Sequence, residues 1–125
     1  MDLSKLEWYS RLEKHKNPLI IFISELENGI ILVVSDRGPR LGTIALGVPT
    51  LLPHDRINIS SMPIVFGIRN DLLTRAIAER VASLCKKIVI VSTHLLNETT
   101  ELAQRALKFA EASMYEFLAK DRKVQ

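Results

Sequence analysis

The sequence predicts an α+β domain, arranged as an α/β sandwich: a mostly antiparallel sheet of five to six strands with two main helices, the second of them C-terminal. Residues 62–93 read as strand, helix, strand, because two β-branched apolar runs flank a segment that is apolar at helical spacing. Further short apolar runs between residues 18 and 48 are separated by turn residues. A helix joined this tightly to two strands must pack across the sheet that holds them.

The chain of 125 residues is expected to form one domain, residues 1–125. Apolar residues make up 47% of it and charged residues 25%, a normal balance for a domain with one core. No apolar run reaches the roughly 20 residues that span a bilayer, and the N-terminus lacks a signal peptide's apolar stretch. We therefore expect a cytoplasmic protein with no membrane partner. The net charge is only +3 and basic residues are interspersed with acidic ones, so no nucleic-acid partner is expected.

The N-terminal segment has two interpretations. Residues 5–11 are interpreted as a strand, because apolar and polar residues alternate around Trp8. A short helix is the alternative, since Leu3, Leu6 and Tyr9 also fit its spacing.

Three strands are expected next, at residues 18–26, 30–35 and 41–48. Asn28 and Gly29 predict a tight turn between the first two, because both residues tolerate positive φ. Residues 36–40 form the next turn. The three strands are predicted to make an antiparallel meander.

The central unit begins with a strand at residues 62–68. Asn70 or Asp71 is expected to accept hydrogen bonds from the free N–H groups of the following helix. The apolar positions of that helix are Leu73, Ala76, Ile77, Val81 and Leu84. A second buried strand is expected at residues 88–91. The preceding residues 49–61 are interpreted as a loop, with a brief edge strand at Ile57 and Ile59 as an alternative.

A long helix ends the chain. Asn97 or Thr99 is expected to cap it, with Glu98 and Glu101 near its positive end. Its apolar stripe follows helical spacing over about four turns. The stripe consists of Ala103, Ala106, Leu107, Ala110, Met114, Phe117 and Leu118.

The strands lack the polar alternation that a sheet with one wet face requires. In the stretch 30–34, for example, every residue is apolar, so both faces of the sheet should leave water. Two helices cover one face of a sheet this size. The other face then needs the N-terminal segment, a second subunit or both, because large exposed apolar patches are unusual on a monomer.

A catalytic or metal-binding constellation is not recognisable. His15, His54 and His94 lie far apart, and no His or Cys has metal-ligand spacing. The single cysteine, Cys85, excludes an internal disulfide and is interpreted as a small buried hydrophobe. We therefore expect no enzymatic activity, no metal and no cofactor. The helix start at residues 67–70 is the best candidate for a small anion, but one glycine is typical of a structural turn rather than a phosphate cradle.

The order of elements resembles a known family. The runs 30–34 and 41–46, the strand 62–68, the helix containing 72–82, the strand 88–92 and the C-terminal helix are similar to the small proteasome-assembling chaperones. The similarity is to the third and fourth of the eukaryotic set and their archaeal relatives, and it covers about residues 18–118. It implies a small non-enzymatic α/β dimer that binds proteasome α-type subunits and helps the α-ring assemble. The chain ends in Val124 and Gln125 and lacks the hydrophobic-Tyr-any-residue tail of another proteasome-linked group.

Three functions follow as hypotheses. The first is a non-enzymatic assembly chaperone for the 20S proteasome α-ring, acting as a homodimer or as a heterodimer with a paralogue. The alternatives are a small-molecule or nucleotide-binding regulatory domain that uses Asn70 and Asp71, and a structural subunit of another complex. For a chaperone, Arg37, Pro39 and Arg40 are the expected partner-binding residues, because the turn is rigid and Arg suits carboxylates. An ordinary solvated turn is the alternative.

Overall fold

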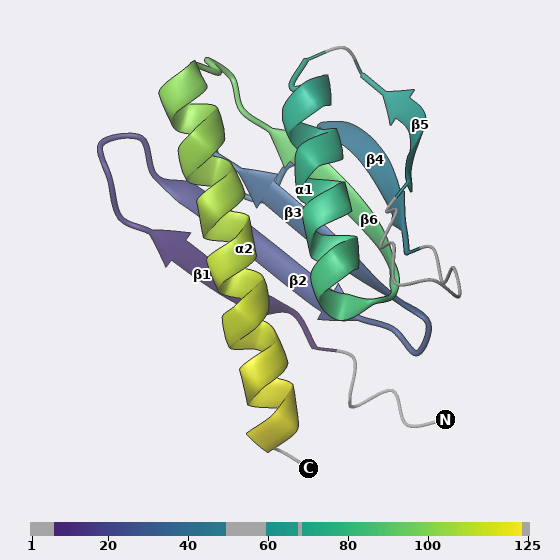
Figure 1. Ribbon diagram of the computed structural model, residues 1–125. Helices are drawn as coiled ribbons and strands as arrows, with labels where there is room; N and C mark the ends of the chain where they lie inside the picture. The colour runs from purple at the N-terminus through teal and green to yellow at the C-terminus, as the bar shows by residue number, and fades with distance from the viewer. Residues whose placement is uncertain (1–6, 50–59, 68, 124–125) are drawn as a thin grey trace.

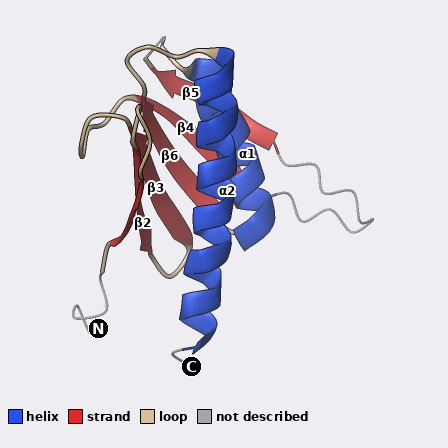
Figure 2. Cartoon of the chain, turned by 90° about the vertical axis from the view of Figure 1, so that its left-hand side faces the viewer, coloured by secondary structure: helices blue, strands red, loops and turns tan. Residues whose placement is uncertain are grey.

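The computed structural model describes residues 7–49, 60–67 and 69–123, and it contains one six-stranded sheet with two helices. The elements follow the order β1 (Tyr9–Glu13), β2 (Leu19–Glu25), β3 (Gly29–Ser35), β4 (Thr43–Val48), β5 (Ser60–Phe66), α1 (Asp71–Cys85), β6 (Ile88–His94) and α2 (Thr100–Lys123) (Figure 1). Both helices lie on the same face of the sheet, as the side view in Figure 2 shows. The predicted fold class is confirmed, including the C-terminal position of the second helix.

The strand order corrects one part of the prediction. The sheet runs β1-β2-β3-β6-β4-β5, so β6 lies between β3 and β4. It is parallel to β3 and antiparallel to β4. The expected meander of β2, β3 and β4 is therefore wrong in its second half. Because β6 carries apolar residues on both faces, the centre of the sheet suits it better than an edge.

The hairpin between β2 and β3 lies where the turn was predicted, but for a different reason. Leu26 N donates to Gly29 O at 2.7 Å and closes the turn. Neither Asn28 nor Gly29 has a positive φ. Gly29 is required because a Cβ there would lie 2.8 Å from the carbonyl oxygen of Ile88 on β6. The constraint is the close approach of β3 and β6, not the turn.

The core lies between the sheet and the two helices. From β2 and β3 it takes alternate residues such as Ile21 and Leu32, which are fully buried. Three residues of the predicted α2 stripe, Ala106, Ala110 and Met114, are also fully buried. Its other members are half-buried against the same core, namely Ala103, Leu107, Phe117 and Leu118.

The ends of α2 and β1 decide between alternatives left open by the sequence. Leu102 N donates to Thr99 Oγ1 at 3.1 Å, so Thr99 rather than Asn97 caps α2. Tyr9–Glu13 form strand β1, shifted toward the C-terminus from the predicted 5–11, whereas Leu3 and Leu6 of the alternative helix lie outside the described residues. Residues 5 and 6 lie outside the described residues, as do Ile57 and Ile59 of the alternative edge strand.

The strand before α1 begins at Ser60, two residues earlier than predicted. No helix in the described residues is long and apolar enough to cross a membrane.

Candidate interaction surface

The face of the sheet turned away from the helices is apolar, and we call it the open face. Strand alternation assigns its residues, because their neighbours Ile21, Leu32 and Val91 are fully buried under the helices. The apolar residues of the open face are Leu12, Ile20, Phe22, Ile31, Val33, Ile44, Leu46, Val48, Ile88 and Ile90, and by the same alternation Ser24, Ser35, Ser92 and His94 also lie on it. Ile88 is 41% exposed and Ile90 is 42% exposed. No described helix covers this face (Figure 2), which agrees with the two-faced pattern of the sequence.

A hollow of about 420 Å³ lies on the open face over β2 and β3. Phe22 and Val33, which are direct partners across β2 and β3, contribute to its lining from the sheet. Trp8 contributes from the segment before β1. Pro39, Arg40 and Leu41 contribute from the connection between β3 and β4. The hollow therefore joins a predicted partner-binding segment to the apolar sheet.

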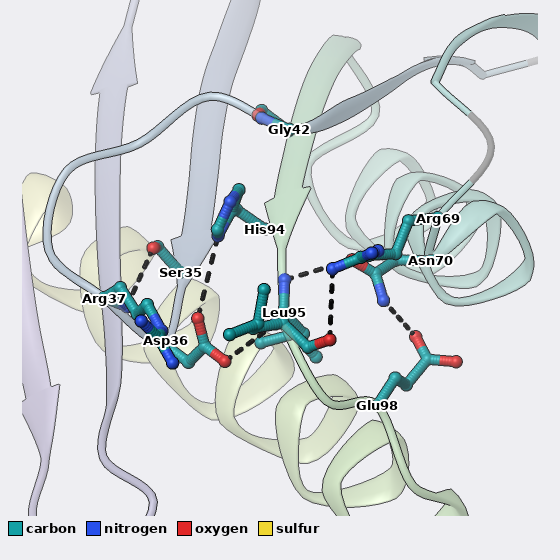
Figure 3. A network of polar contacts seen from close by, with 11 residues as sticks. Ser35, Asp36, Arg37, Gly42, Arg69, Asn70, His94, Leu95 and Glu98 are labelled. Carbon is teal, nitrogen blue, oxygen red and sulfur yellow. Dashed lines mark hydrogen bonds and ion pairs between the residues drawn. The ribbon is translucent and has the colours of Figure 1, made fainter.

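The connection between β3 and β4, residues 36–42, is anchored where it crosses the end of β6. At its start, Asp36 N donates to His94 O at 3.1 Å, and Asp36 Oδ2 accepts from Leu96 N at 2.9 Å. At its end, Gly42 N donates to Ser92 Oγ at 2.8 Å. Figure 3 shows the contacts around Asp36. Both ends of the connection are thus fixed to the same strand and the residues that follow it.

Two features make this crossing tight. Ser35 Oγ accepts from Arg37 N at 3.1 Å, which turns the chain directly after β3. A Cβ at Gly42 would overlap the backbone carbonyl of Thr93, so the chain passes β6 at a distance that only glycine allows. His94 Nδ1 lies 3.7 Å from Asp36 Oδ1, close enough for an ion pair when the imidazole is protonated (Figure 3).

The predicted site residues occupy different places around this crossing. Pro39 and Arg40 line the hollow. Arg37 is exposed nearer the anchored start of the connection. Trp8 and Tyr9 were considered for an interface or for core packing, and Trp8 is 57% exposed whereas Tyr9 packs against the core. Sequence reasoning missed Leu41, which is 73% exposed and begins a predicted strand; its place beside Trp8 becomes visible only once the strand order is known.

The start of α1 has part of the expected cap, from Asp71 and not from Asn70. Asn70 has a left-handed backbone with φ 64° and makes no side-chain capping bond. Its Oδ1 instead accepts from Leu95 N at 3.0 Å, and its Nδ2 donates to Glu98 Oε1 at 2.9 Å (Figure 3). Asp71 accepts only from the adjacent Leu72 N, at 2.8 Å. Asn70 therefore fastens the start of α1 to the β6–α2 connection.

This arrangement argues against the anion site considered for the helix start. The amide of Asn70 is already used on both sides, and the Glu98 carboxylate lies beside it. An approaching phosphate would meet that negative charge at short range, which is unfavourable. The exposed Arg69 offers a positive charge here, but its Nη1 already donates to Leu96 O at 3.2 Å.

The other candidate reactive groups are dispersed. Cys85 is half-buried, and burial raises the pKa of its thiol. His15 contacts Arg105 at 2.8 Å, whereas His94 faces Asp36. His54 lies outside the described residues. Within the described part of the chain, no three His, Cys, Asp or Glu side chains come together in a way that could hold a metal ion.

Comparison with known proteins finds a similarity of structure but none of sequence family. No protein-family model matches the sequence, and no curated protein matches it either. Among solved structures, a chain from the crystal structure of a novel chaperone complex for yeast 20S proteasome assembly has the same fold, with a TM-score of 0.65. The match covers 93% of this chain and 97% of that chain at 14% sequence identity. At this identity the likeness establishes the fold alone, and the expected relation to archaeal proteins stays a prediction.

Proposed function

We propose that this protein is a non-enzymatic chaperone that assists assembly of the 20S proteasome α-ring in the cytoplasm by binding α-type subunits as a dimer. The observation that carries the proposal is the uncovered apolar face on a fold similar to that of a proteasome assembly chaperone. A domain that keeps such a face must cover it with a partner, because an apolar patch of this extent is unusual on a soluble monomer.

The dimer is proposed to form through the open face. Ile31, Ile90 and Leu46 are cross-strand neighbours on β3, β6 and β4, so they form a continuous apolar row across the middle of the sheet. Two such faces can stack at about 10 Å with their side chains interdigitated. The partner is a second copy or a paralogue with a similar face.

Binding of an α-type subunit is proposed to use the connection that carries Arg37, Pro39 and Arg40. The connection is exposed but anchored to β6 at both ends, so little conformational entropy is lost when it binds. Guanidinium groups donate several hydrogen bonds in a fixed plane, which suits carboxylates on a client surface.

The absence of enzymatic activity is proposed on the arrangement of reactive groups. Nucleophilic catalysis needs a nucleophile within hydrogen-bond reach of a base. Cys85 Sγ has its hydrogen-bond partner in the backbone oxygen of Lys87, at 3.9 Å. A robust hydrolase activity abolished by one substitution would contradict this part of the proposal.

Co-purification tests the chaperone function. The tagged protein, isolated from its native organism, should bring down proteasome α-type subunits that mass spectrometry identifies. Recombinant α-type subunits should also co-elute with it in size exclusion. Recovery of a different complex without any proteasome subunit would favour the alternative of a structural subunit elsewhere.

Light scattering after size exclusion tests the dimer. The wild type should have twice the mass of the chain, and Ile90→Asp should be a folded monomer because the residue is partly exposed on the open face. Leu72→Asp is the matched control, since Leu72 is 74% exposed on α1, on the opposite face of the sheet. A wild-type monomer at high concentration, or an Ile90→Asp dimer, would show that the open face is not the interface.

A further inference from the structure

We infer that the hollow beside residues 36–42 binds a client segment in which a large apolar side chain stands next to carboxylates. The identification of that client as an α-type subunit rests on the proposed function. The chemistry of the segment rests on the hollow and on the charges beside it.

The lining of the hollow favours an apolar anchor. Of its six lining residues, Arg40 alone is charged, and the others are Trp8, Phe22, Val33, Pro39 and Leu41. Its volume of about 420 Å³ falls within the roughly 300–1,000 Å³ of small-ligand pockets, so it has room for an aromatic or leucine side chain. Filling it would remove Trp8 and Leu41 from water, and buried aromatic contacts of this kind dominate many interfaces.

The charges beside the hollow favour carboxylates next to that anchor. Of the other described arginines, three have a glutamate partner: Arg11 pairs with Glu116, Arg80 with Glu111 and Arg105 with Glu13. Arg69 instead donates to the backbone oxygen of Leu96. Arg37 and Arg40 have no such partner among the described residues, and both are exposed. Two unpaired guanidinium groups on a fixed connection are complementary to an acidic segment.

The same charges argue against a second copy as the occupant. None of the open-face residues carries a carboxylate. On the described strands, Glu13 and Glu25 are already paired, with Arg105 and Lys87. A second copy placed over the hollow by a two-fold axis would therefore offer no acidic group from its own open face to Arg40. Outside the strands, the exposed Glu7 adjoins Trp8, but this Trp8 already lines the hollow of its own copy and is not free to act as an anchor for another. The partner that fits is therefore a different protein.

The sequence contains one tryptophan, Trp8, and it lines the hollow. Its emission therefore reports occupancy directly. The probes are three short labelled peptides that differ at defined positions: a central Phe flanked by Glu, the same peptide flanked by Lys, and the Glu-flanked peptide with Ala in place of Phe. The Glu-flanked Phe peptide should shift Trp8 emission to the blue and bind at least about tenfold more tightly than the other two.

Variants of the full-length protein link this binding to the named residues. Arg37→Ala with Arg40→Ala should weaken the Glu-flanked Phe peptide by about tenfold or more, and Arg37→Glu with Arg40→Glu should reverse the preference toward the Lys-flanked peptide. The matched control is Lys14→Ala with Lys16→Ala, which removes the same charge from exposed residues outside the hollow lining and should leave binding unchanged.

Three outcomes would overturn the inference: equal binding of the Glu-flanked and Lys-flanked peptides, no binding of any peptide at about 1 mM, or a loss of dimer mass in the double alanine variant. The last would mean that a second copy occupies the hollow. Peptide binding without co-elution of α-type subunits would refute the proposed function and leave the inference standing. If α-type subunits still co-elute with the double alanine variant, the inference is refuted and the proposed function stands.

Discussion

Replacement of Asn70 by alanine should destabilise the protein by about 3 kcal/mol, although the residue contributes nothing to the apolar core. The change removes the acceptor for Leu95 N, which lies 3.0 Å from Asn70 Oδ1 in a fully buried residue. A buried donor left without a partner costs about 1–3 kcal/mol. Alanine must also adopt the left-handed backbone that Asn70 has at φ 64°, at a further cost of about 1 kcal/mol.

Two matched variants separate these contributions. Asn70→Gly loses the same hydrogen bonds without the left-handed penalty and should be about 1 kcal/mol more stable than Asn70→Ala. Asn70→Asp keeps an acceptor for Leu95 N but places a carboxylate beside Glu98, and it should lie between Asn70→Gly and the wild type. Urea unfolding followed by circular dichroism, at one protein concentration, gives the free energies. An alanine variant within about 0.5 kcal/mol of the wild type would refute the role assigned to this side chain.

Three further predictions concern the core, one strand contact and the thiol. Met114→Ala should lower the free energy of unfolding by about 2–5 kcal/mol in urea, because Met114 is fully buried on α2. Leu107→Asp should destabilise the protein less than Met114→Asp does, because Leu107 is only half-buried. The opposite order would mean that α2 is rotated. Gly29→Ala should cost about 1–3 kcal/mol, because its Cβ would lie 2.8 Å from Ile88 O, and an unchanged midpoint would show that β3 and β6 separate easily. Cys85 should react with iodoacetamide more slowly than a free thiol near pH 7.5, because burial raises its pKa and the thiolate is the nucleophile. The folded state holds this proton to higher pH than the unfolded chain, so stability should fall as pH rises above about 8.5; a rate equal to that of glutathione would contradict the burial of the thiol.

The helices and strands could be predicted because each has a signal in its local sequence. The order of the strands in the sheet could not be predicted in this way. The uninterrupted apolar run at 30–34 predicted a strand, and β3 lies there. On its open face Val33 is only 8% exposed although no described helix covers it, because Trp8 and residues 39–41 stand around it. The insertion of β6 between β3 and β4 involves contacts such as that of Gly42 N with Ser92 Oγ, between residues fifty positions apart. No pattern around either residue indicates the other. The prediction that Asn70 caps α1 was wrong for the same reason. Its local sequence is that of a helix cap, but its side chain hydrogen-bonds to Leu95 and Glu98, which are distant in sequence.

The candidate surface was predictable in part. The connection 36–42 was expected to be exposed and fixed, from its turn residues and its place between two apolar strands. The hollow required Trp8 and Phe22 as well, and these come together with Leu41 only through the pairing of β1, β2 and β3. Partner binding by Arg37, Pro39 and Arg40 stays a prediction.

The position of β6 also sets the order in which a growing chain can fold. The β1–β2–β3 sheet has only short-range pairings and is complete once residue 35 has left the ribosome. The next pairing of β3 needs Ile88–His94, so β3 presents an unpaired edge while residues 36–94, almost half of the chain, are being made. Exposed edges invite pairing with other chains, and such distant contacts slow folding. We expect the nascent chain to be most prone to aggregation in this interval, before Ile88–His94 can pair with β3.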